Sequence, residues 1–554
     1  TQAPVVTGNR DELVDFVKEI LMPVADQKGD SLPVSKFASR PAGTFPSGGS
    51  AYEKRGDAGD FPMWIPDNCI QCNQCSFVCP HAAIIPVLLT EEEMADAPET
   101  FETIDAIGKE FKGMKFRIQV NALDCMGCGE CVTVCPTKAI EMKPQESQAA
   151  QQAAFDYCVE NIRKKDNIPG VVSDISVKGS QFNQPLLEFS GSCAGCAETS
   201  YARLITQLFG EKMYISNATG CSSIWGGTAS ISPYTTNKES GFGPAWINSL
   251  FEDNAEHGLG LYLGQKTVRE NLIKRIAEVA GSDKASAELK AAFDKFMETK
   301  NNTKANDEPA KALIAALEAC GCDESKEILK DKQYLAKKSF WIFGGDGWAY
   351  DIGYGGLDHV LASGHDVNVM VFDTEMYSNT GGQASKASNI GEVCQFAAAG
   401  KEISKKSLAE ICMTYGYIYV AQIALGANMN QAVKAIAEAE AYPGPSLIIG
   451  YAPCELHGVK GGMTNCQNEM KKAVEAGYWN LFTFNPALKA EGKNPFTLTS
   501  KAGKMDKYQE FLANETRYSR LSRAFPDRAK ALFEKNQEAA EARYTHLTKL
   551  VDLY

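Results

Sequence analysis

The sequence predicts an α/β protein whose larger part is a mostly parallel sheet, preceded by a smaller cysteine-rich domain. From about residue 183 onward, short apolar runs alternate with helical patterns, which is typical of parallel strands joined by helices. Before that point, two copies of one cysteine motif lie within residues 61–145. A chain of 554 residues is too long for one ordinary domain, so we expect two to four.

The first 60 residues predict an extended arm or connector. One helical pattern opens the segment, and a Gly/Pro/Ser-rich stretch follows it. The apolar residues of that pattern, placed after Asp11, are Leu13, Phe16, Val17, Ile20 and Leu21. Residues 146–182 are polar and predict a linker with one helix.

The larger domain is expected to span residues 183–500. Its expected strands are 186–189, 213–215, 340–343, 367–372, 418–423 and 446–450, with helices at 352–361, 408–415 and 431–441. A charged, Ala/Lys/Glu-rich block at 266–336 predicts a helical insertion. Residues 501–554 predict a C-terminal helical tail.

Composition and charge exclude several classes of protein. The net charge of −13 argues against nucleic acid as a partner. No apolar run approaches the roughly 18 residues that a membrane helix needs. The chain begins at Thr1 without a basic start, so we expect no signal peptide and a missing true start. The 18 cysteines could indicate disulfides, but the chain is large and the cysteines are grouped, which favours metal or redox sites.

The repeated cysteine motif predicts iron–sulfur clusters. Residues 69–80 read CIQCNQCSFVCP, and residues 125–136 read CMGCGECVTVCP. Both fit C-x2-C-x2-C-x3-C-P, in which the fourth Cys ligates the cluster of the other run. We therefore predict a bacterial two-cluster ferredoxin-like domain at 61–145, with a helical insert between the runs. One 4Fe–4S cluster would be held by Cys69, Cys72, Cys75 and Cys135, and the other by Cys125, Cys128, Cys131 and Cys79.

Alternatives remain for this region. Zinc also binds C-x2-C pairs, although it would not explain the full spacing twice. His81 follows Pro80 and is either a ligand or a surface or packing residue.

Four further cysteines could form a third cluster. Residues 193–198 read CAGCAE, Cys221 lies in NATGCSSIWGG, and Cys454 lies in YAPCELHG. Each group follows an expected strand, and loops at the carboxyl edge of a parallel sheet converge. A lone C-x2-C is also typical of a thioredoxin-type redox pair. The other cysteines are expected to be free thiols: Cys158, Cys320, Cys322, Cys394, Cys412 and Cys466.

Two strand ends predict a diphosphate and metal site. The run FWIFGGDG ends at Gly347, and NVMVFD at 368–373 continues into TEMYSNTGGQ. Glycines let backbone N–H groups approach phosphates, and a hard divalent ion prefers oxygen ligands. Asp346 and Thr374 offer such oxygens. A GDG sequence alone is also compatible with a plain turn.

With these motifs in this order, the sequence closely resembles the pyruvate:ferredoxin oxidoreductases, members of the 2-oxoacid:ferredoxin oxidoreductase family. The resemblance covers nearly the whole chain. It includes GDSLPVS, YEKRG, both ferredoxin runs, CAGCAE, GCSSIWGG, GGDGWAYDIG, DTEMYSNTGGQ, YAPCELHG and NPFTLTSK.

The resemblance implies thiamine diphosphate, Mg²⁺ and three 4Fe–4S clusters. It implies that Mg²⁺ is bound by Asp346, Thr374 and the main-chain carbonyl of Met376, and that Asn379 contacts the reacting carbon as the catalytic residue. The inner cluster would be held by Cys193, Cys196, Cys221 and Cys454. The implied cofactor-binding residues are Glu198, Cys221, Gly345, Asp346, Gly347, Trp348, Thr374, Glu375, Met376, Tyr377, Ser378 and Asn379.

The implied activity is oxidative decarboxylation of pyruvate with coenzyme A to acetyl-CoA and CO₂, with electrons passed to ferredoxin or flavodoxin. The family's preceding domains are absent, so we expect a C-terminal half that is inactive without its N-terminal half, in a cytoplasmic homodimer. The alternatives are a pure electron-transfer protein, a structural zinc protein, or an enzyme for 2-oxoglutarate or an aryl pyruvate. His457 and Lys460 would tune the cluster, contact the phosphates or form a polar rim.

Overall fold

The structure, a computed structural model, describes residues 11–163, 173–227, 231–283 and 285–554. The expectations for residues 1–10 and 164–172 lie outside this range. A central eight-stranded sheet runs in the order β15-β14-β12-β13-β9-β8-β6-β7. Its strands are β6 (Met213–Asn217), β7 (Ala245–Asn248), β8 (Ser339–Gly345), β9 (Asn368–Asp373), β12 (Tyr419–Ile423), β13 (Ser446–Tyr451), β14 (Phe482–Phe484) and β15 (Phe496–Leu498). Six strands are parallel, and β14 and β15 pair antiparallel, which confirms the predicted α/β class.

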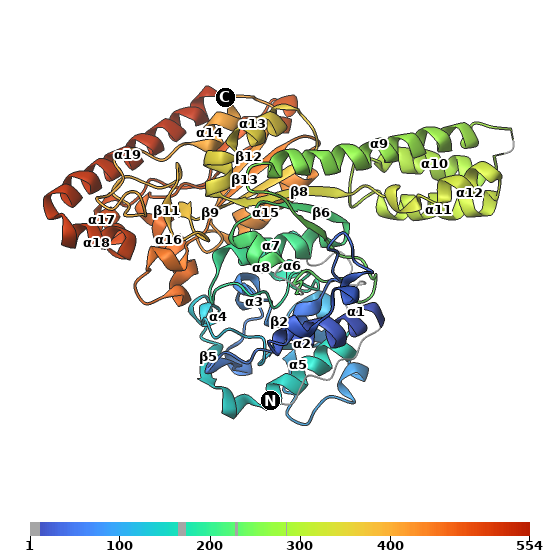
Figure 1. Ribbon diagram of the computed structural model, residues 1–554, viewed down its shortest axis with the longest axis horizontal. Helices are drawn as coiled ribbons and strands as arrows, with labels where there is room; N and C mark the ends of the chain where they lie inside the picture. Colours follow the sequence, from blue (N-terminus) through green and yellow to red (C-terminus); the bar gives the residue numbers. More distant parts are fainter. Residues whose placement is uncertain (1–10, 164–172, 228–230, 284) are drawn as a thin grey trace.

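The central strands form because their apolar residues are buried on both faces. All six residues of β9 and of β13 are buried. Strands covered on both sides read as continuous apolar runs, which is why the sequence predicted five of them. Helices cover the sheet on its two faces (Figure 1): α7 (Ala197–Phe209), α8 (Cys221–Gly226), α13 (Tyr354–Ala362), α14 (Leu408–Met413), α15 (Met429–Ala441) and α16 (Cys466–Ala476).

The expected strand at 186–189 is absent. Leu187 makes only an isolated antiparallel bridge to Tyr234, and Phe189 adopts a left-handed backbone with φ of 53°. That conformation turns the chain out of an extended path. The edge strands β7 and β15, and β14 next to β15, were not predicted, because they are short and only partly buried.

The expected helical insertion projects away from the sheet (Figure 1). It begins within the long helix α9 (Asn254–Ala280) and continues through α10 (Ala287–Thr299), α11 (Asp307–Cys320) and α12 (Asp323–Leu329). Leu289, Phe296 and Leu313 are buried in a core that belongs to these helices. This separate core explains how the insertion extends from the sheet without support from it.

The cysteine-rich region contains strands where a helical insert was expected. Residues between the two runs form β2 (Ile84–Leu89), β3 (Ile104–Asp105) and β4 (Lys115–Val120). β2 and β4 pair antiparallel over six residues each, and their apolar side chains are mostly buried. The other elements are β1 (Asp60–Trp64), β5 (Ile140–Pro144), α3 (Gln74–Val78) and α4 (Glu130–Thr133). The prediction of a helical insert is therefore wrong, since only short 3₁₀ turns separate these strands.

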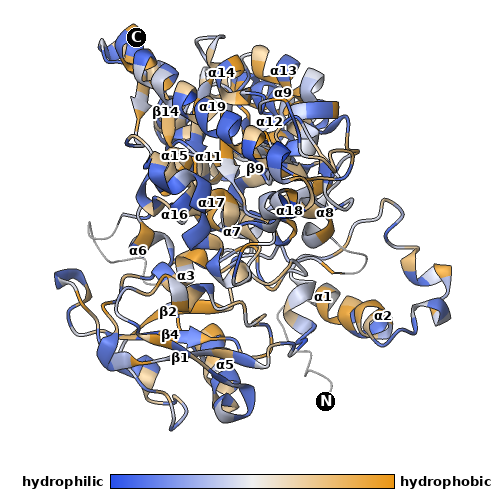
Figure 2. Cartoon of the chain, turned by 90° about the vertical axis from the view of Figure 1, so that its left-hand side faces the viewer, coloured by the Kyte–Doolittle hydropathy of each residue, from blue (hydrophilic) through white to orange (hydrophobic). Residues whose placement is uncertain are grey.

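Helices also precede and follow these regions. The expected N-terminal helical pattern forms α1 (Asp11–Phe16), a π-helical turn (Val17–Leu21) and α2 (Met22–Ala25), and Figure 2 shows apolar residues gathered on α2. The polar segment contains α5 (Ala150–Asn161) and α6 (Val177–Ser180). The C-terminal helices α17 (Tyr508–Ala513), α18 (Thr516–Ala524) and α19 (Pro526–Leu553) pack into the main core through residues such as Tyr508, Tyr518 and Leu521. In the part of the chain that the structure describes, no helix is both long and apolar enough to cross a membrane.

Candidate functional site

Two neighbouring strands end side by side at the centre of the sheet. β8 and β9 are parallel, and Gly345 pairs with Phe372. Asp346 directly follows β8, and Thr374 directly follows β9. Because α/β folds bind ligands beyond the carboxyl ends of their parallel strands, this edge is the candidate site.

The oxygens of three residues converge at this edge. The Thr374 hydroxyl lies 2.9 Å from Asp346 Oδ1 and 3.0 Å from the carbonyl oxygen of Met376. Adjacent ligands of an octahedral Mg²⁺ ion stand about 2.9 Å apart, because each lies about 2.0–2.1 Å from the metal. The geometry therefore fits two edges of such a ligand shell. We call Asp346, Thr374 and Met376 the metal corner.

The carboxyl group of the metal corner is fully buried. Burial, followed by the nearby carboxylate of Asp373, raises the pKa of Asp346 well above its usual range. Ser385 donates a hydrogen bond of 2.6 Å to the other carboxylate oxygen of Asp346. A cation here would favour the ionised carboxylate, because opposite charges attract strongly where water is excluded. The donor set thus suits a hard divalent cation.

The glycines beside the metal corner have different roles. A Cβ at Gly347 would lie 2.6 Å from the ring of Tyr377, so no larger residue fits there. A Cβ at Gly345 would meet nothing closer than 3.9 Å, so the space beside Gly345 is open. Trp348 is buried behind this turn. The open backbone at Gly345 could approach a phosphate group closely.

The loop after Thr374 connects the metal corner to a cluster of cysteines. The Ser378 hydroxyl lies 2.6 Å from the Thr374 hydroxyl and also faces the thiol of Cys454. Asn379 is exposed, and its Oδ1 accepts a hydrogen bond of 3.9 Å from Cys221 Sγ. Residues 374–379 therefore lie between the metal corner and these sulfur atoms.

Four cysteines gather beside this loop. Besides burial and Glu198, the nearby Cys196, Cys454 and Cys193 raise the pKa of the Cys221 thiol, so these four cysteines lie close together. We call these four residues the inner cysteine site. Burial, followed by the carboxylate of Glu198, raises the pKa of both Cys196 and Cys221. Positively charged iron would offset this cost, because the thiolate is the metal-binding form of cysteine.

Glu198 lies within the inner cysteine site and is buried. Trp225 Nε1 donates a hydrogen bond of 2.9 Å to Glu198 Oε2. Burial raises the pKa of Glu198 to about 7, against the lowering effect of that hydrogen bond.

The inner cysteine site forms differently from expectation. Cys221 and Cys454 do follow strands β6 and β13. Cys193 and Cys196 follow no strand, and Cys196 instead caps the start of α7. The convergence of strand ends therefore explains two of the four positions. The other two lie in the turn that precedes α7.

The eight cysteines of the repeated motif line two separate cavities. One is lined by Cys79, Cys125, Cys128 and Cys131, and we call it the middle cavity. The other is lined by Cys69, Cys72, Cys75 and Cys135, and we call it the outer cavity. Each cavity thus has three cysteines from one run of the motif and the fourth cysteine from the other run, as the motif predicts. Among the described residues, no three Cys, His, Asp or Glu side chains lie close enough to hold a single metal ion.

One segment joins the inner cysteine site to the middle cavity. Cys466 is fully buried, and besides burial the nearby Glu130, Cys196 and Cys128 raise the pKa of its thiol. Gln467 donates a hydrogen bond of 3.2 Å to Glu130 in α4. Thr133 donates one of 3.0 Å to the carbonyl of Thr464. Sequence reasoning treated Cys466 as an unrelated free thiol, because no local pattern links it to residues more than 300 positions earlier.

Two histidines are more buried than expected. His81 is buried, lies 3.2 Å from the carbonyl of Cys193, and lines the middle cavity. His457 is also buried, and its Nε2 donates a hydrogen bond of 2.8 Å to the carbonyl of Thr374. The expectation of a polar rim is wrong for His457, whereas Lys460 is exposed. His81 is a packing residue rather than a surface residue.

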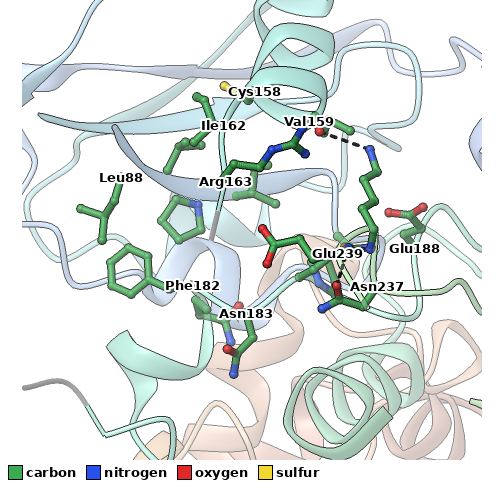
Figure 3. Close-up of a pocket in the computed structure, with 18 of the residues that line it drawn as sticks. Leu88, Cys158, Val159, Ile162, Arg163, Phe182, Asn183, Glu188, Asn237 and Glu239 are labelled. Carbon is green, nitrogen blue, oxygen red and sulfur yellow. Dashed lines mark hydrogen bonds between the residues drawn. The ribbon is translucent and has the colours of Figure 1, made fainter. Parts of the chain in front are cut away.

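A cavity of about 400 Å³ lies between β2, α5 and residues 182–188 (Figure 3). Its wall includes Leu88, Phe182 and Glu188, and Lys238 donates a hydrogen bond of 3.4 Å across it to the carbonyl of Val159. The cavity lies apart from the metal corner and the cysteines that line the other two cavities.

Glu188 in this cavity should make stability depend on pH. Burial raises the pKa of Glu188 to about 7, although Lys238 and Lys54 lower it. The folded protein thus holds a proton that the unfolded chain, with a Glu pKa of about 4.3, has released, so stability falls as pH rises from about 4.5 to 7. Glu188→Gln should raise the free energy of unfolding by about 1–3 kcal/mol at pH 8 and by little at pH 4.5. Urea unfolding at both pH values measures this. The exposed Glu160→Gln is the control, and an equal effect of Glu188→Gln at both pH values would contradict it.

Family models match three parts of the chain. Residues 2–58 match a domain of unknown function, residues 68–139 match a 4Fe-4S dicluster domain, and residues 329–449 match the C-terminal TPP-binding domain of thiamine pyrophosphate enzymes. The dicluster match contains all eight cysteines of the middle and outer cavities, which indicates two 4Fe–4S clusters. The thiamine pyrophosphate match contains the metal corner, which indicates a thiamine diphosphate site.

Similar proteins match along nearly the whole chain. The chain is 52% identical to the pyruvate:ferredoxin oxidoreductase of Moorella thermoacetica and 51% identical to the pyruvate-flavodoxin oxidoreductase of Enterobacter agglomerans. Each match covers 97% of this chain, which spans 46% of the relative's length. A solved 2-oxoglutarate:ferredoxin oxidoreductase from Magnetococcus marinus is 15% identical, with a TM-score of 0.29 over 48% of this chain and 64% of that chain. The chain is therefore a homologue of the pyruvate:ferredoxin/flavodoxin oxidoreductases and belongs with their C-terminal portion.

Proposed function

We propose that this chain supplies the electron-transfer half and the diphosphate half of an enzyme that oxidises pyruvate with coenzyme A to acetyl-CoA and CO₂. Electrons pass through three 4Fe–4S clusters to ferredoxin or flavodoxin. The observation that carries this proposal is the contact of Cys221 Sγ with Asn379 Oδ1 at 3.9 Å, because it joins the inner cysteine site to the loop of the metal corner. A redox site in contact with a thiamine site is what an electron-releasing decarboxylation needs.

The metal corner fits Mg²⁺, which would be held by Asp346, Thr374 and the carbonyl of Met376. Bound thiamine diphosphate would supply a nucleophilic ring carbon, and its cationic ring would serve as the electron sink when CO₂ leaves. The protein residues that would hold it are Glu198, Cys221, Gly345, Gly347, Trp348, Tyr377, Ser378 and Asn379. Glu375 would contribute only its main chain, because its buried carboxylate bonds to other side chains. Among them, Asn379 is exposed at the open side of the loop, where a substrate can approach it.

The inner cysteine site would hold the third cluster and receive electrons first. Cys454 faces Ser378 and Cys221 contacts Asn379, so these sulfurs are the ones that touch the loop. The middle cavity follows, because His81 lines it and also lies 3.2 Å from the carbonyl oxygen of Cys193. The outer cavity comes last, and Ile70 in its wall is 51% exposed, which leaves room for an external carrier.

The remaining parts of the enzyme are proposed from its relatives. The chain spans 46% of the length of those relatives, so the substrate and coenzyme A pockets would lie in an N-terminal half that completes the thiamine site. We place the complete enzyme in the cytoplasm as a homodimer. Pyruvate is proposed as the substrate because both relatives are named for it.

Metal analysis of anaerobically prepared chain tests this proposal. Three clusters predict about twelve irons and an equal amount of labile sulfide, at four of each per cluster. The chain alone should not oxidise pyruvate, and adding the N-terminal half should produce coenzyme A-dependent reduction of ferredoxin. Turnover by the chain alone would refute this dependence. Zinc in place of iron would refute the redox role.

A further inference from the structure

Glu375, in the loop of the metal corner, carries a buried carboxylate that bonds to residues outside that corner. Glu375 lies between Thr374 and Met376, is fully buried, and has a left-handed backbone with φ of 60°. Residues other than glycine rarely adopt this conformation, and they keep it only where the surroundings enforce it. The conformation matters because it directs the Thr374 hydroxyl and the Met376 carbonyl toward the same point.

Four side chains hold the Glu375 carboxylate, and none of them belongs to the metal corner. Arg517 lies 2.9 Å from Oε2, and Tyr478 donates a hydrogen bond of 2.6 Å to the same oxygen. Lys405 Nζ lies 3.0 Å from Oε1, and Asn389 donates a hydrogen bond of 3.3 Å to the same oxygen. Together they hold the side chain that fixes the strained backbone.

Arg517 is the group that reaches Glu375 from the C-terminal helices. It lies in α18, and its side chain is 1% exposed. Its guanidinium lies 2.6 Å from Glu515 and 3.3 Å from Glu392, so it connects three buried carboxylates. Its main-chain carbonyl accepts a hydrogen bond of 2.8 Å from Val393. A planar guanidinium can contact several carboxylates at fixed angles, which an ammonium group cannot do.

Lys405 has a different set of contacts. Its ammonium group also lies 2.8 Å from Asp373, which precedes the metal corner, and it packs over the ring of Trp479. Lys405 therefore shares its charge between two carboxylates and cannot replace Arg517 at Glu392 and Glu515.

We propose that Arg517 is a positioning residue for the metal corner. It holds Glu375 in the left-handed conformation and thereby sets the Thr374 and Met376 oxygens at the spacing that Mg²⁺ requires. Arg517 touches neither the metal nor the cofactor. This inference rests on the proposed function, since it concerns the same Mg²⁺ and thiamine diphosphate site.

Mn²⁺ binding to the full chain tests this role. Mn²⁺ replaces Mg²⁺, and loss of the free Mn²⁺ signal in electron paramagnetic resonance reports binding in the presence of thiamine diphosphate. Arg517→Met should weaken Mn²⁺ binding by about tenfold or more, because it leaves buried carboxylates without their partner. Arg517→Lys should weaken it by about threefold, because lysine keeps the positive charge but lacks the planar guanidinium. The control is Arg528→Met in α19, which removes an exposed ion pair between Arg528 and Glu402. That variant should bind as the wild type does.

A double-mutant cycle separates positioning from general stability. Glycine accepts the left-handed conformation without strain, so Glu375→Gly removes the need for the anchor. In that background, Arg517→Met should weaken Mn²⁺ binding by less than about twofold. A loss of the same size in both backgrounds would overturn the proposal. If Arg517→Met does not fold, as judged by circular dichroism and iron content, the Arg517→Lys result decides, and unchanged binding by that variant overturns the proposal. Failure of the wild type to bind Mn²⁺ with thiamine diphosphate would instead refute the proposed function.

Discussion

Replacing Asp346 with Asn should abolish most Mn²⁺ binding while leaving the fold intact. Asp346 is the charged member of the metal corner, and the other two oxygens are neutral. Groups outside a ligand set are commonly worth 10–100-fold in metal affinity, so loss of the charged ligand should weaken binding by at least about 100-fold. Titration of Mn²⁺ with thiamine diphosphate, followed by electron paramagnetic resonance, measures the change.

The same substitution should not destabilise the protein without metal. Burial and Asp373 raise the pKa of Asp346, so an ionised carboxylate is costly there when no cation is bound. An Asn amide keeps the size and can still bond to Ser385. The melting temperature without metal should therefore be unchanged or higher. Asp351→Asn, five residues further along and paired with Lys386, is the control and should keep wild-type affinity. Equal affinities of the wild type and Asp346→Asn would rule out the metal corner.

The centre of the parallel sheet could be predicted because its strands are mostly apolar and mostly buried. β9 and β13 are buried along their whole length, so composition alone identifies them. The short strands at one end of the sheet could not be predicted in this way. β14 and β15 are three residues each, and the alternating burial of β14 resembles that of many surface segments. The expected strand at 186–189 has strand-like composition, but it lacks a neighbour to pair with beyond one bridge at Leu187.

The candidate site, too, could be predicted from the sequence only in part. Asp346, Thr374 and the eight motif cysteines stand in local patterns whose spacing indicates their chemistry. The contacts that support them do not. Arg517 reaches Glu375, and Gln467 reaches Glu130, across 142 and 337 positions of sequence respectively. Such pairs form only when helices and strands have packed, so no local periodicity or spacing indicates them.

The contacts at Glu130 also explain how separate parts of the chain could act as one electron path. Burial raises the pKa of Glu130 to about 8, although hydrogen bonds from Gln467 and Cys466 lower it. A buried carboxyl group needs hydrogen-bond partners to offset the cost of burial. Through its bonds to Gln467 and Cys466, Glu130 joins α4, beside the middle cavity, to the start of α16, beside the inner cysteine site. The distance between the two cysteine sites is therefore fixed by packed elements rather than by a loop.

Replacing Cys454 with Ala should remove the inner cluster and leave the other two in place. Cys454 follows β13 and belongs to the inner cysteine site, while the middle and outer cavities have four cysteines each without it. Iron should fall from about twelve per chain to about eight if the whole cube is lost, or to about eleven if only its unanchored corner leaves. Either result removes one 4Fe–4S signal from the reduced spectrum. Iron analysis with electron paramagnetic resonance of the reduced chain measures both quantities.

Cys466→Ala is the sharpest control for this experiment, because Cys466 lies near Cys196 without belonging to the inner cysteine site. Its thiol is fully buried, and Cys196 is near enough to help raise its pKa, so it is the available substitute if one of the four assigned cysteines is not a ligand. The assignment requires Cys466→Ala to keep about twelve irons, at four per cluster. If Cys466→Ala loses iron and Cys454→Ala keeps it, the inner ligand set is wrong and Cys466 replaces Cys454. If both variants keep all their iron, no cluster is anchored beside Ser378 and Asn379, and the electron path from the thiamine site has no first step.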